Sequence, residues 1–391
     1  MKIAIVSFDF VESSLCLARY LSEKAEVTYF VITSPTRMNQ AGCDLRGQML
    51  WPGINTLRLQ KYHNLNEYLK ECPLKVKAIH YFPGHKLFNK ANSLVTKRVI
   101  RQINDSDFDI VNIVGQTNQL LDYHKGLKAP KVHTFHEIFN HALNQPLHSK
   151  LLNYCVDTEC GVILHSYFNY KSFLEQFPDF DLVRLDTIPF GLFESYLSYY
   201  NESIKREDSM VLFFGNVNQY KGVPVLIQAF EKLNQKNPDI RLVIAGKIKP
   251  NLKSELILNL PGNAKIIDMF LDNKDITTLI QKAGVVVCPH TSASQSGIPA
   301  LAFLFGKCII ASNVGAFSEV IEDGKTGYLV TPNNVDELYR ALNFVFSDVD
   351  NINSIENQVK QLLIKSNDIW RSVAEQTLIV YRKNIKRINN A

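Results

Sequence analysis

Short apolar runs alternate with segments of helical periodicity through most of the chain, and this alternation is typical of parallel α/β construction. The apolar runs of the first half predict strands, and the periodic segments between them predict helices. The predicted strands are Lys2–Ser7, Val27–Ile32, Ile110–Val114, Val132–Phe135 and Gly161–Leu164. The predicted helices are Ser13–Leu21, Leu94–Ile103 and Tyr167–Glu175.

A second alternation begins at Met210, after an irregular stretch near Ile188 and a polar, Tyr-rich segment typical of a linker. It predicts strands at Met210–Phe214, Arg241–Ala245, Gly284–Cys288 and Cys308–Ala311. It predicts helices at Val223–Leu233, Asp275–Ala283, Pro299–Phe305 and Val335–Phe346. The chain closes with an amphipathic, basic segment, Trp370–Ile388, which predicts a final helix.

The fold class that this pattern predicts is α/β, with two doubly wound, Rossmann-like domains that face a cleft. A chain of 391 residues is longer than one ordinary α/β core, so two domains are expected. The predicted division is a first domain over residues 1–193, a linker over 194–208, a second domain over 209–365 and a closing helix over 366–391. Ligands of such sheets bind outside the carboxyl ends of the strands, so the cleft is the expected site.

Composition places the chain among ordinary globular proteins, with 46% hydrophobic and 21% charged residues. No stretch approaches the roughly 20 apolar residues of a membrane helix. The chain begins with a charge and an apolar run, but Asp9 and Glu12 interrupt the run, which favours a buried strand over a signal peptide. Seven cysteines stand without a CxxC motif or a Cys/His cluster, which predicts neither a zinc site nor a disulfide framework. A reduced, cytoplasmic protein is expected.

Positive charge is concentrated in the first domain. Between Leu50 and Arg101, ten Lys/Arg residues stand against two acids, whereas the whole chain carries a formal charge of +5. The ten are Arg58, Lys61, Lys70, Lys75, Lys77, Lys86, Lys90, Lys97, Arg98 and Arg101. A solvated basic face is the simpler interpretation, and a patch for an anionic membrane surface or an anionic acceptor is the alternative. No recognised nucleic-acid motif accompanies the stretch, so nucleic acid is not an expected partner.

A loop that combines glycine with a lysine follows the predicted strand Met210–Phe214. Gly215 lets the backbone approach a ligand, and Gly222 opens a helix whose first amides favour an anion. Lys221, at the start of that helix, adds a flexible point charge suited to a phosphate. The alternative is an ordinary loop whose lysine faces solvent.

A second loop follows the strand that ends at Cys288 and leads into an apolar helix. Ser294, Ser296 and the amides around Gly297 can donate hydrogen bonds to an anion at this helix terminus. Capping of the helix by the serines is the alternative, and it is compatible with phosphate binding. The sequence leaves both interpretations open.

Several motifs together carry a resemblance to a known family. They are Gly215 with Lys221-Gly222, Leu242-Val243-Ile244-Ala245-Gly246, the run from Gly306 to Gly315 and the run from Glu319 to Val330, with weaker matches at His133-Thr134-Phe135-His136 and Ile188-Pro189-Phe190-Gly191. The segment from Met210 to Phe346 resembles the donor domain of the large retaining glycosyltransferase family with the GT-B fold, often called family four. Trp370 and Tyr381 resemble the closing helix of that family, which crosses back onto the first domain.

The sequence also departs from the family pattern. The family has two glutamates around the second phosphate loop, whereas this chain has Gln295-Ser296-Gly297 at the first position and Leu301 or Ala302 near the second. A subgroup of similar bacterial enzymes also carries Gln-Ser-Gly, so the substitution does not by itself imply inactivity. Asn216 replaces the family's arginine after Gly215 and leaves Lys221 as the main cation. The usual paired glycines of the first loop are replaced by Phe10-Val11-Glu12-Ser13-Ser14.

The resemblance implies a reaction in which a donor diphosphate leaves the anomeric carbon of a sugar through an oxocarbenium-like transition state. Negative charge then grows on the leaving phosphate, and preorganised cations and amides stabilise it. The implied catalytic residues are His136 and Lys221. The implied donor and diphosphate-binding residues are Gly215, Asn216, Lys221, His290, Ser294, Gln295, Ser296 and Gly297.

Other interpretations remain for the histidines and the acids. His136 is implied to hold a hydroxyl of the donor sugar, and a capping or core histidine is the alternative. His133, in the strand that precedes His136, is expected to pack within the sheet. The family generally needs no metal at the diphosphate, and no cofactor is implied beyond the donor. The strings Asp107-Phe108-Asp109 and Asp179-Phe180-Asp181 are expected to serve turns and strand entries rather than a metal.

The leading hypothesis is a hexosyltransferase-type, retaining glycosyltransferase that moves a sugar from a nucleotide sugar to a glycan or lipid-linked acceptor. The expected location is the cytoplasm, with a peripheral place at the inner face of the membrane. A catalytically silent GT-B subunit that binds a nucleotide or a partner is the alternative, because the glutamates are missing and Asn216 is neutral. A GT-B epimerase would need carboxylates facing the sugar, and the second domain supplies few.

Overall fold

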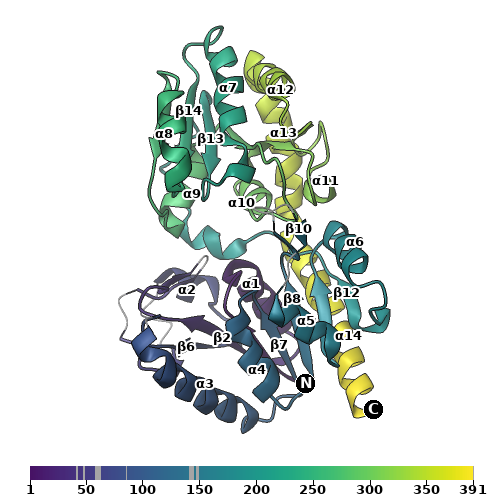
Figure 1. Ribbon diagram of the computed structural model, residues 1–391. Helices are drawn as coiled ribbons and strands as arrows, with labels where there is room; N and C mark the ends of the chain where they lie inside the picture. Colours follow the sequence, from purple (N-terminus) through teal and green to yellow (C-terminus); the bar gives the residue numbers. More distant parts are fainter. Residues whose placement is uncertain are drawn as a thin grey trace. The chain divides into compact units, whose positions relative to one another are not determined.

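The computed structural model describes residues 1–40, 43–46, 49–57, 63–84, 86–140, 145–146 and 149–390. The chain divides into two compact units (Figure 1). Unit 1 consists of Met1–Ile138, Pro146–Ser198 and Asn367–Ala391, and unit 2 of Phe139–Gln145 and Tyr199–Ser366. Within the described residues, no helix is both long and apolar enough to cross a membrane.

Unit 1 is built on an eight-stranded sheet of order β12-β11-β8-β7-β1-β2-β6-β5. Its neighbouring strands pair in parallel, except that β5 runs antiparallel to β6. The strands are β1 Lys2–Ser7, β2 Glu26–Thr33, β5 Gly53–Thr56, β6 Lys75–His80, β7 Ile110–Val114, β8 Lys131–Phe135, β11 Gly161–Leu164 and β12 Leu185–Thr187. Two short antiparallel ribbons join β3 Asn39–Gln40 to β4 Cys43–Asp44, and β9 Phe139–Asn140 to β10 Gln145–Pro146.

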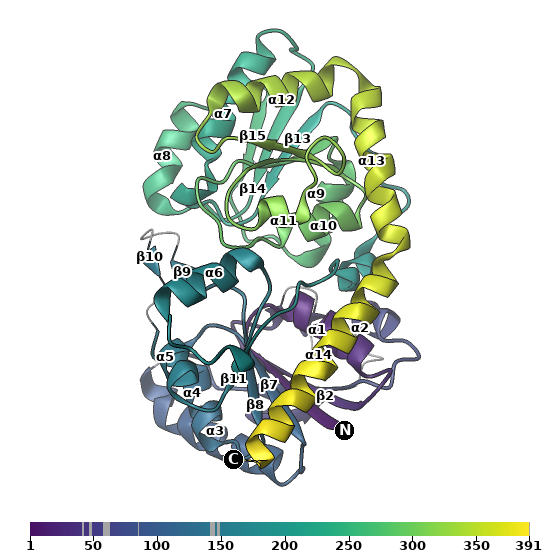
Figure 2. The ribbon, with the colours of Figure 1, turned by 90° about the vertical axis from the view of Figure 1, so that its right-hand side faces the viewer.

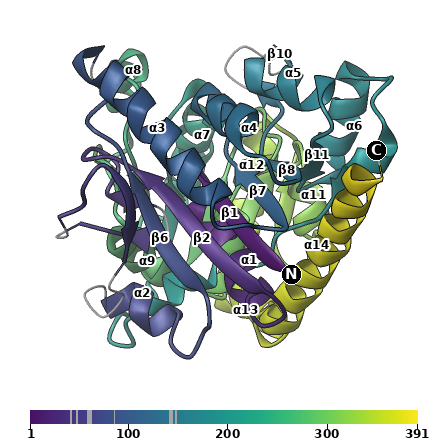
Figure 3. The same cartoon turned by 90° about the horizontal axis from the view of Figure 1, so that it is seen from below.

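Helices cover both faces of this sheet (Figure 3). The helices α1, α2 and α14 pack on one face, and α3, α4, α5 and α6 pack on the other. Their bounds are α1 Val11–Leu21, α2 His63–Tyr68, α3 Asn89–Asn104, α4 Leu121–Gly126, α5 Lys150–Asp157, α6 Tyr167–Gln176 and α14 Ser366–Asn389. Short 3-10 turns are η2 Lys86–Phe88, η3 Asn118–Leu120, η4 Leu182–Arg184 and η5 Glu194–Tyr199.

The final helix, α14, is part of unit 1 although it follows unit 2 in sequence (Figure 2). Its buried Trp370 donates from Nε1 to the Leu192 carbonyl oxygen at 2.7 Å. The hydroxyl of Tyr381, also buried, accepts from Asn112 Nδ2 at 2.8 Å. Two aromatic side chains and two hydrogen bonds therefore attach this helix to the strands and loops of unit 1.

Unit 2 is built on a six-stranded parallel sheet of order β15-β14-β13-β16-β17-β18. The strands are β13 Met210–Phe214, β14 Arg241–Ala245, β15 Ala264–Ile267, β16 Val285–Cys288, β17 Cys308–Ser312 and β18 Tyr328–Val330. The helices are α7 Val223–Asn234, α8 Pro250–Leu258, α9 Asn273–Lys282, α10 Ile298–Leu304, α11 Phe317–Val320, α12 Val335–Ser347 and α13 Val349–Ile364, and η6 is Gln219–Lys221. Both units are doubly wound parallel sheets, so the predicted α/β class with two Rossmann-like sheets is confirmed.

Every strand and helix named from the periodicity is present, with differences at the element ends, but several elements were not predicted, among them β6, α5, α8 and the 16-residue α13. The helix predicted over Leu94–Ile103 begins earlier, at Asn89, because its first turn is polar and carries no apolar period. Short elements such as β12 and β18 were missed, since three residues are too few to establish a pattern. The segment predicted as a linker begins with η5, and the division between the units follows Ser198.

Candidate active site

The carboxyl ends of β13 and β14 meet backbone to backbone in unit 2. Gly215 and Gly246, each directly after its strand, have φ of 113° and 145°. A Cβ on Gly246 would stand 2.0 Å from the Gly215 carbonyl oxygen, so only glycine fits there. At Gly215 a Cβ would meet nothing nearer than Ile298 Cδ1, at 3.9 Å. The loop after β13 thus faces the start of α10, as the predicted phosphate-binding arrangement requires.

The loop that holds Lys221 packs against the loop after β16. Gly222 is left-handed, with φ 65°, and a Cβ on it would lie 1.7 Å from the Pro289 carbonyl oxygen. The Thr291 amide donates to the Tyr220 carbonyl oxygen at 2.8 Å. These two contacts bring together loops that are about seventy residues apart in sequence, and they depend on glycine at position 222.

This packing places the Lys221 ammonium 2.7 Å from His290 Nε2. An ammonium has donors only, so Lys221 donates and Nε2 accepts, which assigns the ring proton of a neutral His290 to Nδ1. His290 is buried and meets the Phe317 ring edge to face, with the ring centroids 5.2 Å apart. Lys221 is half-buried. The lysine is therefore held by a fixed partner and is not the solvent-facing loop lysine of the alternative interpretation.

The second predicted loop is anchored by its backbone. The Ala316 amide donates to the carbonyl oxygen of the buried Ser294 at 3.1 Å, and a Cβ on Gly315 would lie 1.8 Å from the Ala293 carbonyl oxygen. The Ser296 hydroxyl accepts from the Ile298 amide at 3.3 Å from the position before the N-cap, and in this described stretch no side chain caps α10 at the N-cap itself, so the predicted capping by serine is not what the structure has. Gln295, Ser296 and Gly297 are half-buried, and Gly297 is the N-cap residue of α10.

The structure thus groups most of the predicted donor residues at one edge of the sheet of unit 2. Gly215 adjoins the start of α10, and Lys221 contacts His290 in the loop that continues to Ser294. Asn216 lies beside Gly215 and is exposed. A cation, several amides and several hydroxyls at the ends of parallel strands are the groups that a phosphate needs.

The other predicted catalytic residue, His136, belongs to unit 1 and follows β8. Only 4% of its surface is exposed. Its Nε2 lies 3.3 Å from the Ser13 hydroxyl oxygen, and its ring centroid lies 4.3 Å from that of His165. Burial lowers the pKa of His136 well below its usual range, so the ring is neutral at pH 7. A cavity of about 20 Å³ borders Ser13, His136 and His165, which is room for about one water molecule.

Phe10 covers His136 from the loop where the resembled family has paired glycines. Its ring is stacked on the imidazole, with centroids 3.8 Å apart and an interplanar angle of 8°. Phe10 has φ 58° and ψ 40°, a left-handed conformation that costs a residue with a Cβ about 1–2 kcal/mol. The Phe10 ring therefore covers one face of the His136 imidazole.

Glu12, in the first turn of α1, is a residue that the sequence analysis did not select. It is half-buried beside Ser13. Burial raises the pKa of its carboxyl group to about 7, and the charge of Asp9 adds to the rise. A carboxyl group that titrates near neutral pH can give or take a proton at this point of unit 1. The only sequence signal at this position is that the acid Glu12 follows the aromatic Phe10 by two residues.

A larger pocket of about 460 Å³ lies at the carboxyl ends of β1, β2 and β6 in unit 1. Its lining is mostly neutral and polar and includes Arg37, Tyr81, Asn92, Ser93, Thr96 and Tyr123. The Tyr81 hydroxyl lies 2.6 Å from that of Tyr123 and 3.0 Å from that of Thr96. The volume is that of a small-molecule site. No sequence motif marked it, because three strands and α3 contribute to it separately.

The residues expected to have structural roles have them. His133 is buried in the sheet, and its Nε2 lies 2.8 Å from the Gly115 carbonyl oxygen. The Asp109 carboxylate accepts from the Lys2 amide, and that of Asp181 accepts from the Val183 amide in η4. Within the described ranges, neither Asp-x-Asp string joins a group that could hold a metal. The expectation that they serve strand entry and a turn is confirmed.

Comparison with known proteins agrees with this geometry. Residues 201–362 match the family model of "Glycosyl transferases group 1". An "MMP alpha-(1->4)-mannosyltransferase" of Mycolicibacterium hassiacum is 31% identical over 172 residues, which cover 43% of this chain and 41% of the relative. A "Phosphatidyl-myo-inositol mannosyltransferase" of Mycolicibacterium smegmatis is 30% identical over 145 residues, 37% of each chain. The matched stretch therefore spans less than half the length of these curated relatives.

Solved structures resemble the chain over nearly its whole length. Anabaena Alr3699/HepE in complex with UDP and glucose has a TM-score of 0.64 at 17% identity, covering 97% of this chain and 98% of that one. A glycosyltransferase from Rickettsia africae has a TM-score of 0.65 at 18% identity, covering 98% and 99%. These likenesses establish the GT-B fold. The family match concerns residues 201–362, so this similarity to glycosyltransferases in sequence lies in unit 2.

Proposed function

We propose that the protein is a glycosyltransferase that moves a sugar from a nucleoside diphosphate donor to a glycan or lipid-linked acceptor. The observation that carries the proposal is the contact of Lys221 Nζ with His290 Nε2, 2.7 Å apart, inside the stretch that matches the group 1 family model. This contact holds an ammonium beside the glycines and serines that resemble the family's phosphate-binding loops.

The reaction needs charge stabilisation more than bond-making by the protein. As the bond from the anomeric carbon to the diphosphate breaks, negative charge grows on the leaving oxygen. A preorganised donor at such a position contributes about 2.7–4 kcal/mol to the barrier reduction. Lys221 is the proposed source of that stabilisation, and the amides and hydroxyls of Ser294–Gly297 are proposed to bind the diphosphate beside it.

The proposed donor is a uridine diphosphate sugar, because the Anabaena protein of the same fold was solved with UDP and glucose. We further propose that the transfer retains the anomeric configuration and needs neither a metal at the diphosphate nor a cofactor. The family resemblance and the composition of the loops support this, since an ammonium takes the place that a metal ion would have. His136 is proposed to touch the donor sugar once Phe10 has moved.

The pocket of unit 1 supports a glycan as the acceptor. Hydroxyl and amide groups of Tyr81, Asn92, Ser93 and Tyr123 line it, and such groups match the hydroxyls of a sugar. Its cation, Arg37, is engaged with Asp9 at 3.0 Å, so the pocket is not built mainly for an anion. We therefore assign the pocket to a neutral sugar of the acceptor.

Helix α3 supports a lipid-linked form of that acceptor. Asn92 and Ser93 of this helix line the pocket, while Lys90, Lys97 and Arg98 are exposed. The side chain of Leu94, on the same helix, is 67% exposed although it is large and apolar. Exposed cations together with an exposed leucine suit the anionic inner face of a membrane. We propose that α3 contacts the membrane next to the acceptor pocket. Two cations of the predicted basic stretch, Arg58 and Lys61, lie outside the described residues.

The experiment that tests the proposal is donor turnover. The full chain is screened with UDP-, GDP- and ADP-sugars for thermal stabilisation, and each stabilising donor is then tested for release of the nucleoside diphosphate. A donor present at 100 times its Kd stabilises by about 2.7 kcal/mol, which is visible as a melting shift. Release should not depend on added Mg²⁺ or Mn²⁺. The product's anomeric configuration, read by NMR, tests retention.

Matched variants separate the outcomes. Lys221→Ala should abolish most turnover, whereas Lys232→Ala should not, because Lys232 is an exposed lysine of α7 that pairs with Asp336. Binding of a nucleotide without any release from any donor would favour the catalytically silent subunit. Interconversion of the sugar without transfer would favour the epimerase.

A further inference from the structure

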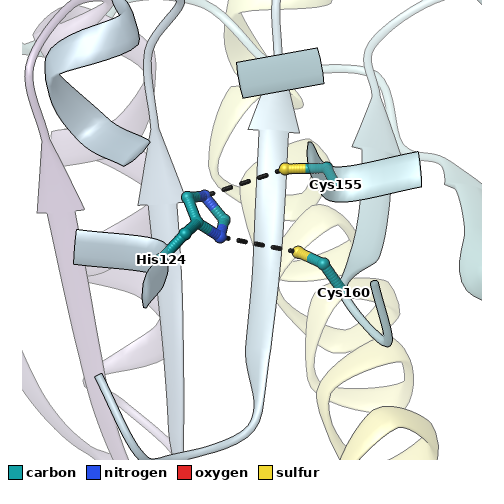
Figure 4. A group of neighbouring side chains, drawn as sticks. All are labelled: His124, Cys155 and Cys160. Atoms are coloured by element: carbon teal, nitrogen blue, oxygen red, sulfur yellow. Dashed lines mark hydrogen bonds between the residues drawn. The ribbon is translucent and has the colours of Figure 1, made fainter. Parts of the chain in front are cut away.

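Three side chains from different elements meet in the interior of unit 1 (Figure 4). They are His124 of α4, Cys155 of α5 and Cys160, which directly precedes β11. All three are buried, at 1%, 0% and 3% exposure. One ligand atom of each lies within 4.8 Å of the other two. The sequence analysis expected no Cys/His cluster, and this expectation is wrong: Cys155 and Cys160 are four intervening residues apart, a spacing found in zinc sites, and the fold brings His124 to them.

The hydrogen bonds around His124 decide which of its nitrogens is a donor. His133 Nε2 lies 2.8 Å from the Gly115 carbonyl oxygen, which can only accept, so Nε2 carries the proton. A neutral His133 then has a lone pair on Nδ1, and His124 Nε2 lies 2.8 Å from it. His124 therefore donates from Nε2 and keeps its lone pair on Nδ1. That nitrogen faces Cys160 Sγ at 4.0 Å.

This arrangement is the one that supports a metal-binding histidine. Such a histidine usually donates its other ring N–H to an acceptor, which sets the tautomer and the ring orientation. Here the chain from His124 through His133 to the Gly115 carbonyl does this with two contacts of 2.8 Å. The acceptor nitrogen, Nδ1, is thereby turned toward Cys160, while Cys155 Sγ lies 3.8 Å from the other nitrogen, Nε2.

Charge also favours a divalent cation at this place. Two thiolates and one neutral imidazole around Zn²⁺ have no net charge, so the complex avoids the large cost of an unpaired buried ion. Thiolate and imidazole are the ligands that zinc prefers. The bond lengths of about 2.3 Å to sulfur and about 2.0 Å to nitrogen put ligand atoms roughly 3.3–3.8 Å apart. Cys160 Sγ lies 4.0 Å from Nδ1, whereas Cys155 Sγ lies 3.8 Å from Nε2 at the other edge of the ring. Since one ligand atom of each residue lies within 4.8 Å of the other two, side-chain movements of about 1 Å bring Cys155 to the Nδ1 edge.

We propose that His124, Cys155 and Cys160 bind a structural Zn²⁺, with His133 as the outer partner that orients His124. Binding releases two protons, one from each thiol, and leaves the fourth position to a water molecule. Because the group is enclosed, the ion enters as the chain folds and then links α4, α5 and the start of β11. This site is distinct from the donor loops of unit 2, and its zinc has no part in the sugar transfer.

The test is metal content, which does not depend on any activity. The full chain is produced in zinc-containing medium and dialysed, and its metals are measured by mass spectrometry. About one Zn²⁺ per chain is expected. Cys155→Ser and Cys160→Ser should each lose it, whereas Cys16→Ser should retain it, because Cys16 is a buried thiol of α1 in the same unit but outside the cluster. His133→Phe, which keeps the ring but removes the acceptor, should weaken Zn²⁺ binding about 10–100-fold.

A second measurement keeps the proposal testable if a variant does not fold. Zinc-loaded and chelator-treated wild-type chains are compared by thermal melting, and readdition of Zn²⁺ should restore the higher melting temperature. Wild-type chain without zinc, or with a Cys155–Cys160 disulfide found by mass spectrometry, would overturn the proposal. Equal zinc loss in Cys16→Ser, or copper in place of zinc, would overturn it as well.

Discussion

The ammonium of Lys221 contacts a buried imidazole and lies over the ring of Tyr220. Lys221 donates to His290, and His290 is in turn buried against Phe317. The resembled family places an arginine near this lysine, and Asn216 stands at that position here. A single cation must then offset most of the charge that develops on the leaving diphosphate.

Replacement of Lys221 should therefore lower kcat strongly. We expect Lys221→Ala to reduce kcat on the order of 100-fold or more, with a smaller change in KM, because the lost interaction strengthens as the bond breaks. Lys221→Arg should restore activity only in part, since the guanidinium is broader and shaped for bidentate contacts. Steady-state kinetics with the best donor measures both variants. Full activity of a folded Lys221→Ala chain would assign the phosphate to other residues.

His290 acts through Lys221 in this proposal and is a positioning residue. His290→Ala should lower kcat about 10-fold, because the ammonium loses the acceptor that orients it. His290→Gln should recover much of the loss, since its amide oxygen can accept from the ammonium. If His290 had only a structural role, both variants would lose stability and neither would change kcat. Kinetics and melting temperatures measured on the same samples separate the two.

Glu12 should leave a signature in the pH dependence of stability. Its folded pKa of about 7 lies above its ordinary value of 4.5, so the folded state keeps the proton longer than the unfolded state does. The free energy of unfolding therefore falls as pH rises from about 4.5 to 7, and Glu12→Gln should remove this loss. The gain of the variant over wild type should grow through that window to an upper limit on the order of 3 kcal/mol.

The comparison must be made as a difference between variants. Burial lowers the pKa of His165 to about 4, and that of His136 is lowered too, so both histidines cost stability as pH falls below about 6.5. They are unchanged in Glu12→Gln and cancel in the subtraction. Urea denaturation at pH 5 and 8 provides the data, with the exposed Glu67→Gln as control. A difference that does not vary with pH would contradict the shift.

At the scale of elements, α3 has two proposed roles, one at the pocket and one at a membrane surface. Val99 and Ile103 pack on the sheet, Asn92 and Ser93 reach the acceptor pocket, and the remaining surface is basic with Leu94 exposed. Because the apolar face of α3 is buried on the sheet, the proposed membrane contact depends on its exposed cations and on Leu94.

Binding to anionic vesicles tests this role of α3. Loss of Lys97, Arg98 and Arg101 together should weaken binding to phosphatidylserine vesicles by about 3 kcal/mol, roughly 100-fold, at about 1 kcal/mol per cation. High salt should weaken wild-type binding in the same way. Lys265→Ala with Lys325→Ala, two exposed lysines of unit 2, should leave binding unchanged. Equal binding to neutral and anionic vesicles would leave the solvated basic face as the interpretation.

At the scale of the whole molecule, the last segment of the chain completes the first unit. Trp370 and Tyr381 of α14 are buried with β1, β2 and α1, although the whole of unit 2 lies between these segments in sequence. Unit 1 therefore cannot complete its core until the chain is finished.

Trp370→Ala should destabilise unit 1 selectively. Truncation of a buried tryptophan costs about 3–5 kcal/mol, and here it also leaves the Leu192 carbonyl without its donor. Hydrogen exchange should accelerate in β1 and β7, with little change in β13 and β16. Ile379→Ala, at a residue of α14 that is 63% exposed, is the control and should have a small effect. Equal acceleration in both units would mean that they unfold as one.

Periodicity and local backbone chemistry are what the sequence by itself determined. Apolar runs marked the central strands of both sheets, because a strand buried on both faces needs continuous apolar side chains. Gly215, Gly222 and Gly246 were readable as loop glycines, and all three have positive φ. Such features depend on neighbouring residues alone, so the α/β class and the position of the donor loops followed from the chain.

Contacts between side chains of different segments are determined only by the tertiary structure. The contact of Lys221 with His290 joins residues 69 apart, and that of His136 with Ser13 joins residues 123 apart. Phe10 over His136 and the cluster of His124, Cys155 and Cys160 arise in the same way. Which side chains meet depends on the order of the strands and on the register between them, because these set where the connecting loops and helices lie. No local pattern encodes that choice, because the whole core sets it.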